Sequence, residues 1–229
     1  MLRAPALGRD LIKLVDVGKS FQGRRVLNRV NLEVGASEIT VIRGRSGAGK
    51  TTLLKLIALL IKPDEGRVFV EGLDAWSLRE GERTRLASNA MSYIPQLIDL
   101  IPSLSVRENI ELPALIRGVP KSVRERALQD VIGLLGLSNI LERRVGTLSG
   151  GEKQMVALAR SLVSKPKLVV ADEPFAYVDD AGVETLFGVV RDLRDRLGTS
   201  FIITTTELYL KSFSGDKEYF LVNGSLTRV

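Results

Sequence analysis

Short apolar runs along the chain predict β-strands. Residues 38–43 contain the β-branched run Ile-Thr-Val-Ile, which is typical of a buried strand. The predicted strands cover residues 11–17, 26–34, 38–43, 67–70, 91–94, 168–171 and 201–205. Near the end of the chain, Asn223-Gly224 joins residues 218–222 to 226–229 in a predicted hairpin.

Longer segments with one polar and one apolar face predict helices. They cover residues 50–61, 106–117, 122–135, 151–164 and 181–197. Strand-like runs are scarce between residues 96 and 165, so the pattern is an α/β layer interrupted by a helical insertion. We therefore expect one domain over residues 1–229, with a core of 1–95 and 166–229 and a helical subdomain of 96–165.

Composition narrows the possible chemistry. The 229 residues include no cysteine and no histidine, which excludes disulfides, thiolate and imidazole metal sites and Ser-His triads. The 33 Lys and Arg exceed the 27 Asp and Glu by 6, but they are spread along the chain. Aromatic residues make up only 5%, too few for a base-stacking platform, so no nucleic-acid partner is expected.

No segment reads as a membrane span or secretion signal. The longest apolar stretch, residues 53–61, contains Lys55 and is far shorter than the roughly 20 residues that a spanning helix needs. We therefore expect a cytoplasmic protein whose membrane attachment, if any, is made through a partner.

A glycine-rich loop supplies the first candidate site. Residues 44–51 fit the phosphate-binding pattern G-x-x-x-x-G-K-[ST] and lie between a predicted strand and a predicted helix. The backbone amides of such a loop point at phosphate, and the helix start adds its positive end. Lys50 is expected on the β- and γ-phosphates and the Thr51 hydroxyl on Mg²⁺. The predicted nucleotide-binding residues are Gly44, Arg45, Ser46, Gly47, Ala48, Gly49, Lys50, Thr51 and Thr52.

Two carboxylates follow the apolar run at 168–171. Because ligands bind at the carboxyl ends of strands in open α/β sheets, Asp172 and Glu173 are expected beside the phosphate loop. Asp172 is predicted to hold Mg²⁺, and Glu173 to orient or deprotonate an attacking water.

Together with four further features, these residues resemble the ATP-binding subunits of ATP-binding cassette (ABC) transporters over nearly the whole chain. Ser149, Gly150 and Gly151 resemble the family's signature loop, and Gln96 its glutamine loop. Asp179 matches the D-loop aspartate, and Phe21 stands where the family carries an aromatic residue that stacks on adenine. Without the resemblance, Phe21 could be a core residue, Gln96 a surface amide and Ser149 a helix cap.

The resemblance implies a fold, an activity and partners. The fold is α/β, a P-loop NTPase core with a mixed sheet, an antiparallel β subdomain and an inserted α-helical subdomain. The activity is ATP hydrolysis with ATP and Mg²⁺, the metal being held by Thr51, Gln96 and Asp172. Two subunits, identical or different, would enclose ATP head to tail, each signature loop facing the other subunit's phosphate loop. A transmembrane permease would contact the helical subdomain and hold the protein at the inner face of the cell membrane.

The sequence departs from the family pattern after the strand at 201–205. Thr206 stands where the family carries a histidine that contacts the γ-phosphate, and it shortens the side chain and removes the imidazole. By analogy with the loss of one preorganised donor, we expect slower turnover by roughly 10²–10³. Met155 replaces an arginine that often follows the signature, and no role is assigned to it.

Residues 101–113 are similar to the lipoprotein-release and macrolide-export group of ABC ATPases, and also to the cell-division ATPases. An ordinary amphipathic helix stopped by Pro113 would look much the same. Two other functions remain open at this point. One is an ATP-binding regulatory subunit with weak or no hydrolysis, which Thr206 allows, and the other is a soluble ABC ATPase without a transporter.

Overall fold

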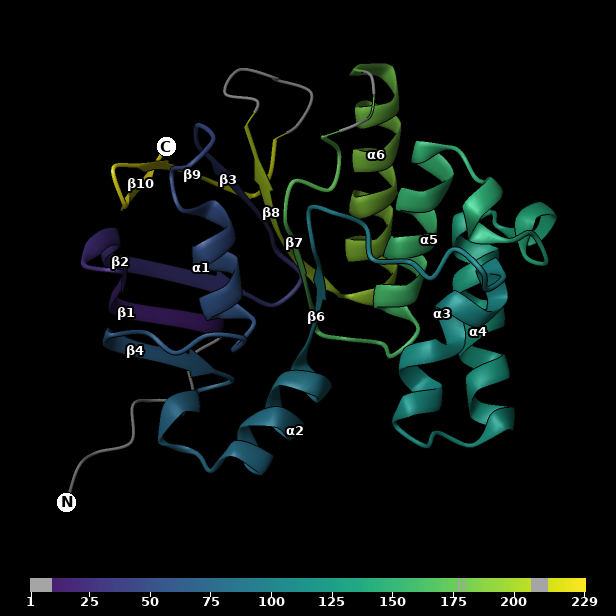
Figure 1. The fold of residues 1–229 in the computed structure, drawn as a ribbon, viewed down its shortest axis with the longest axis horizontal. Coiled ribbons are helices and arrows are strands. Elements are labelled where there is room, and N and C mark those ends of the chain that lie inside the picture. The colour runs from purple at the N-terminus through teal and green to yellow at the C-terminus, as the bar shows by residue number, and fades with distance from the viewer. Residues whose placement is uncertain (1–9, 177, 179, 207–213) are drawn as a thin grey trace.

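The computed structural model describes residues 10–176, 178, 180–206 and 214–229. In Figure 1, two sheets occupy the left and centre of the molecule and a group of helices occupies the right. The sheets and helices follow the α/β pattern that the sequence predicts.

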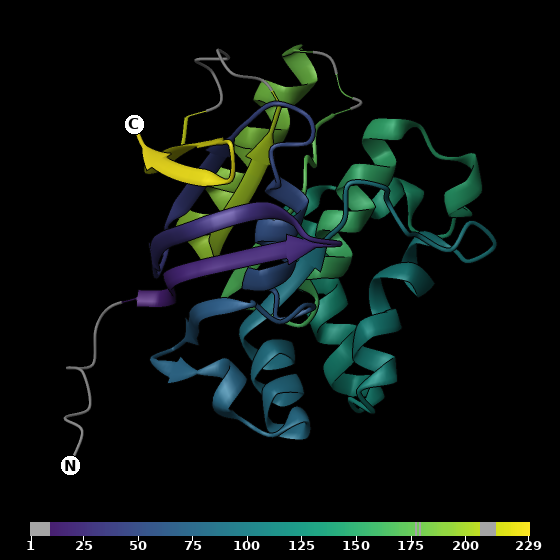
Figure 2. The ribbon, with the colours of Figure 1, turned by 60° about the vertical axis from the view of Figure 1, so that its left-hand side comes forward.

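An antiparallel sheet begins the described chain, with strand order β2-β1-β4-β5. Its strands are β1 (Asp10–Phe21), β2 (Arg24–Gly35), β4 (Glu65–Val70) and β5 (Leu73–Asp74). β1 and β2 form a long hairpin that arches across the front of Figure 2. Apolar residues on one face of this sheet, such as Ile12, Leu32 and Val68, are buried against the rest of the core.

The second sheet has six strands in the order β10-β9-β3-β8-β7-β6. They are β3 (Ile39–Arg43), β6 (Met91–Ile94), β7 (Leu168–Ala171), β8 (Ser200–Thr205), β9 (Lys217–Val222) and β10 (Ser225–Arg228). All neighbours are parallel except β9 and β10, which form the hairpin predicted around Asn223-Gly224. Because β3, β8, β7 and β6 run the same way, their carboxyl ends lie at one edge of the sheet.

The described helices are α1 (Lys50–Ile57), α2 (Glu80–Ala90), α3 (Val106–Ile116), α4 (Lys121–Leu135), α5 (Gly150–Leu162) and α6 (Asp180–Leu197). Three short 3₁₀ turns cover Ala75–Ser77, Ser138–Ile140 and Val145–Thr147. α1 is packed between the two sheets, since Leu53, Leu54 and Ile57 share one buried cluster with Val68 and Val170. α3, α4 and α5 gather on the right of Figure 1 and remain a separate group after the rotation to Figure 2.

Two helices differ from the sequence prediction. α1 ends at Ile57 rather than at residue 61, and Leu59 then takes a left-handed φ of 59° that ends the helical path. α2 is not predicted at all, because its sequence is polar on nearly every side and only Ala90 is buried. None of the helices in the described residues is long and apolar enough to cross a membrane.

Candidate functional site

The glycine-rich loop connects β3 to α1 at the carboxyl edge of the parallel strands. Gly47 and Gly49 adopt left-handed φ values of 77° and 102°, which glycine tolerates best. Gly49 is also the N-cap of α1, whose start has no side-chain cap and no acidic residue in its first turn. The amides at this helix start are therefore available to a ligand, and an anion would meet the positive end of the helix.

A groove of about 1050 Å³ opens beside this loop. One wall is the loop itself, from Gly44 to Ala48, and the others are the start of β2 and the β9–β10 hairpin. Arg24, Arg25 and Arg45 line it and give it a positive charge. Its size and charge suit a nucleotide.

Lys50 connects the glycine-rich loop to Glu173, one of the two residues of the acid pair Asp172 and Glu173. Its side chain is only 4% exposed, and Nζ donates to the carbonyl oxygens of Gly44 at 2.7 Å and Arg45 at 3.1 Å. Nζ also lies 3.1 Å from Oε1 of Glu173, whose side chain is 13% exposed. The buried cation is thus paired and hydrogen-bonded, as burial of a charge requires. Next to it, Thr51 lies exposed on the first turn of α1, and Thr52 is partly buried.

The acid pair begins directly after β7. Asp172 is 1% exposed, and its Oδ1 accepts a hydrogen bond from Thr204 Oγ1 at 2.8 Å. Its Oδ2 is buried and has no hydrogen-bond partner among the residues that the structure describes. A buried carboxylate oxygen without a hydrogen-bond partner is suited to a cation. Burial, reinforced by the negative charge of Asp172, raises the pKa of the neighbouring Tyr93 hydroxyl, which stays neutral.

Glu173 has an unusual backbone conformation. Its φ of 45° lies in the left-handed region, which is uncommon for residues other than glycine. Its amide donates to Thr204 Oγ1 at 3.0 Å, and its carboxylate lies between Lys50 and Gln96. Gln96 follows β6, and its Nε2 donates to Glu173 Oε2 at 3.4 Å.

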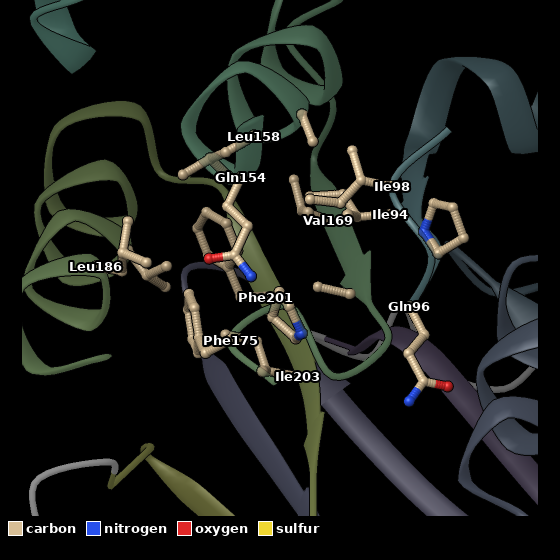
Figure 3. A pocket seen from close by; sticks show the side chains of 15 residues that line it. Ile94, Gln96, Ile98, Gln154, Leu158, Val169, Phe175, Leu186, Phe201 and Ile203 are labelled. Carbon is tan, nitrogen blue, oxygen red and sulfur yellow. The ribbon is translucent and has the colours of Figure 1, made fainter. Parts of the chain in front are cut away.

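An apolar cavity lies beneath Gln96, between β6, β7 and β8 on one side and α5 and α6 on the other. Figure 3 shows Leu158, Leu186 and Phe201 around it, with the amide of Gln96 apart from these side chains. Its volume of about 30 Å³ is no more than a water molecule occupies, so it cannot hold a nucleotide. The groove beside the glycine-rich loop is therefore the candidate substrate site.

Phe21 lies at the end of β1 with 47% of its surface exposed, and Lys19 Nζ is 5.5 Å from its ring centroid. It pairs across the hairpin with Arg24, which lines the groove. Phe21 is therefore not a core residue, and its ring is open to a stacking partner.

The predicted signature residues lie away from the glycine-rich loop in this chain. Ser149 caps α5, its Oγ accepting from Glu152 N at 3.3 Å while Glu152 Oε2 accepts from Ser149 N at 2.7 Å. Gly150 and Gly151 are exposed at this helix start. In Figure 1, α1 and α5 lie on opposite sides of the central strands.

The last two predicted site residues are Thr206 and Asp179. Thr206 is exposed just beyond β8. Asp179 lies outside the described residues.

Comparisons with known proteins agree with this geometry. The family model described as "ABC transporter" matches residues 27–176. The chain belongs to the ABC transporter family.

The "Lipoprotein-releasing system ATP-binding protein LolD" of Bacteroides thetaiotaomicron is 37% identical over 95% of this chain and 100% of its own length. The LolD protein of Paramagnetospirillum magneticum is 40% identical over 85% of this chain and 88% of its own. A dimeric structure of MJ0796, a bacterial ABC transporter cassette, superposes with a TM-score of 0.83 at 29% identity, covering 95% of this chain and 97% of that one.

These findings confirm the predicted fold class and activity. The chain is an ATP-binding, ATP-hydrolysing subunit of an ABC transporter, and the resemblance to the lipoprotein-release group is confirmed. MJ0796 is also known as a dimer in a post-hydrolysis state bound to ADP and Pi, at a TM-score of 0.83 and 28% identity. Neither the regulatory subunit nor the soluble ATPase without a transporter is favoured.

Sequence reasoning missed one residue of this ABC ATPase site. Thr204 is fully buried and contacts both acidic residues, yet it belongs to no motif. The available signal was its place in the run Thr204-Thr205-Thr206 at the end of a parallel strand, where polar side chains meet the ligand edge of the sheet.

Proposed function

We propose that this subunit hydrolyses ATP with Glu173 as the general base, inside a dimer that drives a lipoprotein-releasing membrane complex. The observation that carries the proposal is the convergence of Lys50 Nζ and Gln96 Nε2 on the Glu173 carboxylate, at 3.1 and 3.4 Å, beside the buried Asp172. A lysine at the start of a helix behind a glycine-rich loop, with a shielded carboxylate within reach of it, supplies the groups that phosphoryl transfer uses.

ATP would bind in the groove beside residues 44–52. The loop amides and the start of α1 would hold its phosphates. Lys50 would leave Glu173 and bind the β- and γ-phosphate oxygens instead. Phe21 would stack on the adenine, since its ring is half-exposed at the edge of the β1–β2 hairpin.

The oxygen donors around Lys50 and Glu173 fit Mg²⁺. The unpartnered Oδ2 of Asp172, the exposed hydroxyl of Thr51 and the Gln96 amide oxygen are hard ligands of the kind this cation prefers. When bound, Mg²⁺ would offset the charge of the phosphate oxygens. Asp172 would contribute mainly through water, and Thr51 and Gln96 would complete the ligand set.

Glu173 would accept the proton of the attacking water. Once ATP draws Lys50 away, the carboxylate is released from its ion pair and its oxygens are free to accept a proton from water. General-base catalysis of this kind contributes about 10²–10⁴ in rate. Gln96 would orient the same water through its amide, and Thr206 would donate one hydrogen bond to the γ-phosphate.

A second subunit would complete each site. Ser149, Gly150 and Gly151 would bind the γ-phosphate held by the partner, because an exposed helix start with free glycine amides is a good anion site. Asp179, which is outside the described residues, stays a predicted nucleotide-binding residue. If each subunit binds the γ-phosphate held by the other, one chain needs two helix starts suited to phosphate. They lie on opposite sides of its central strands.

The membrane assignment rests on the relatives named lipoprotein-releasing system ATP-binding proteins. We infer one domain over residues 1–229, whose helical subdomain, residues 96–165, contacts a transmembrane permease from the cytoplasmic side. ATP would close the dimer and hydrolysis would reopen it, and the permease would follow between two states.

The test is phosphate release by Glu173→Gln in the purified full chain. We expect turnover to fall by at least about 10²-fold while ATP binding is retained. Glu142→Gln is the matched control, because Glu142 is an exposed carboxylate in the helical segment whose partner is Arg107. Turnover in Glu173→Gln equal to that of the control would refute the general-base role.

A further inference from the structure

Thr204 is a polar residue in a fully buried position. It lies near the end of β8, opposite Ile42 of β3, and one residue beyond the pair formed by Ile203 and Ala171 of β7. β3 leads into the glycine-rich loop and β7 into the acid pair. Thr204 therefore stands between the two halves of the nucleotide site.

Its hydroxyl makes two hydrogen bonds, one as donor and one as acceptor. Oγ1 donates its single proton to Asp172 Oδ1 at 2.8 Å and accepts from the amide of Glu173 at 3.0 Å. The first bond restrains the rotation of the Asp172 carboxylate, which also interacts with the neighbouring Tyr93 hydroxyl, and Oδ2 has no hydrogen-bond partner among the described residues. The second holds the backbone of Glu173 at its left-handed φ of 45°.

We infer that Thr204 is a positioning residue for this acid pair. It would keep Oδ2 of Asp172 free for the metal that Asp172 would help to hold, and it keeps the Glu173 main chain in the conformation that sets its carboxylate beside Lys50 and Gln96. The inference rests on the proposed roles of Asp172 and Glu173. A hydrogen-bonded partner behind a metal-binding carboxylate generally fixes the ligand's direction and basicity.

If Thr204 had only a structural role, its loss would change stability but not metal binding. A buried hydroxyl that only satisfies the end of a strand would affect the free energy of unfolding and leave metal binding unchanged. Threonine and valine have nearly the same shape, so Thr204→Val removes the hydrogen bonds with little change in packing. Thr204→Ser restores the hydroxyl and loses only a methyl group.

The experiment compares these two variants in the purified full chain. Mn²⁺ serves as the probe, its affinity for the ADP-bound protein being measured by electron paramagnetic resonance and ATP turnover by phosphate release. We expect Thr204→Val to lower Mn²⁺ affinity and turnover by about 10- to 100-fold, and Thr204→Ser to restore both to within about threefold. Thr40→Val is the matched control, because Thr40 is equally buried in β3 but donates to Glu38 away from the acid pair.

The comparison of these variants decides whether Thr204 positions the acid pair. Wild-type Mn²⁺ affinity and turnover in Thr204→Val would overturn the inference, and so would a loss in Thr204→Ser as large as that in Thr204→Val. If Thr204→Val does not fold, Thr204→Ala takes its place and must show the same losses relative to Thr204→Ser. Glu173→Gln is assayed in parallel: full turnover there refutes the proposed function, whereas an inactive Glu173→Gln beside an active Thr204→Val refutes only the role of Thr204.

Discussion

Lys50 Nζ lies 3.1 Å from Glu173 Oε1, so the cation of the phosphate loop and the carboxylate proposed as base neutralise each other before nucleotide arrives. Both side chains are largely buried. Because the attraction between buried charges is screened less than in water, ATP phosphates have to compete with Glu173 for Lys50.

This competition predicts the effect of Glu173→Gln on ATP affinity. Removal of the negative charge frees Lys50 and also removes repulsion between the carboxylate and the triphosphate. We expect the dissociation constant of Mg·ATP, measured by calorimetry, to fall by roughly 3- to 10-fold. Glu142→Gln should leave it unchanged, and weaker ATP binding in Glu173→Gln would contradict the competition.

Ser149 offers a test of the signature loop that separates helix capping from phosphate binding. Aspartate is as good an N-cap as serine, so Ser149→Asp keeps α5 capped but puts a negative charge where the partner's γ-phosphate would lie. We expect thermal stability close to that of the parent and loss of ATP-induced dimers in the Glu173→Gln background, measured by light scattering.

Ser105 is the matched control for that variant. It caps α3 through the same reciprocal hydrogen bonds, with Glu108 in the position that Glu152 takes in α5. Ser105→Asp should therefore preserve the ATP-induced dimer. Dimers in Ser149→Asp as abundant as in Ser105→Asp would show that the loop does not face phosphate.

Thr206 is predicted to limit the rate of hydrolysis. It is exposed beyond β8, so a larger side chain is tolerated there. Thr206→His would supply a longer donor toward the γ-phosphate, and we expect turnover to rise by roughly 10²–10³. Unchanged phosphate release by Thr206→His in the active complex would remove any role for this position.

Arg43 and Glu218 give a pH-dependent prediction for stability. Arg43 Nε donates to Glu218 Oε2 at 3.0 Å, and Ser214 Oγ donates to Oε1 at 2.5 Å. Burial by itself raises the pKa of Glu218, but the hydrogen bonds from Ser214 and Arg43 outweigh it and lower the pKa below the ordinary 4.5. The ionised form is therefore favoured by folding.

The ionised Glu218 carboxylate therefore stabilises the folded state. Stability from Glu218 is complete above pH 4.5 and is lost as the pH falls through the lowered pKa of the folded state. Glu218→Gln should reduce the free energy of unfolding by about 1–3 kcal/mol at pH 7, and the difference should shrink in acid. Urea unfolding at several pH values measures it, and a difference independent of pH would contradict the ionic contribution.

The sequence predicted most of the fold because apolar periodicity reports which faces are buried. It found the fully buried β3 and β7 and the β9–β10 hairpin with its Asn223-Gly224 turn. It missed α2, whose residues are mostly in contact with solvent, and it extended α1 past Ala58, since Leu59 looks helical until its backbone turns left-handed.

The candidate site was predicted where motifs exist and missed where contacts depend on strand order. Spacing alone identified Lys50 and Glu173, but their 3.1 Å pairing requires β3, β8 and β7 to be adjacent and parallel. Thr204 acquires its contacts only through the same adjacency. No local pattern marks that arrangement.

In the proposed dimer, two copies of this chain enclose ATP between the phosphate loop of one copy and the signature loop of the other. Light scattering of the purified Glu173→Gln chain with Mg·ATP measures whether this dimer forms. We expect the 25.1 kDa species to double in mass on adding ATP and to return to 25.1 kDa on adding ADP. A mass that stays at 25.1 kDa with saturating ATP bound would contradict it.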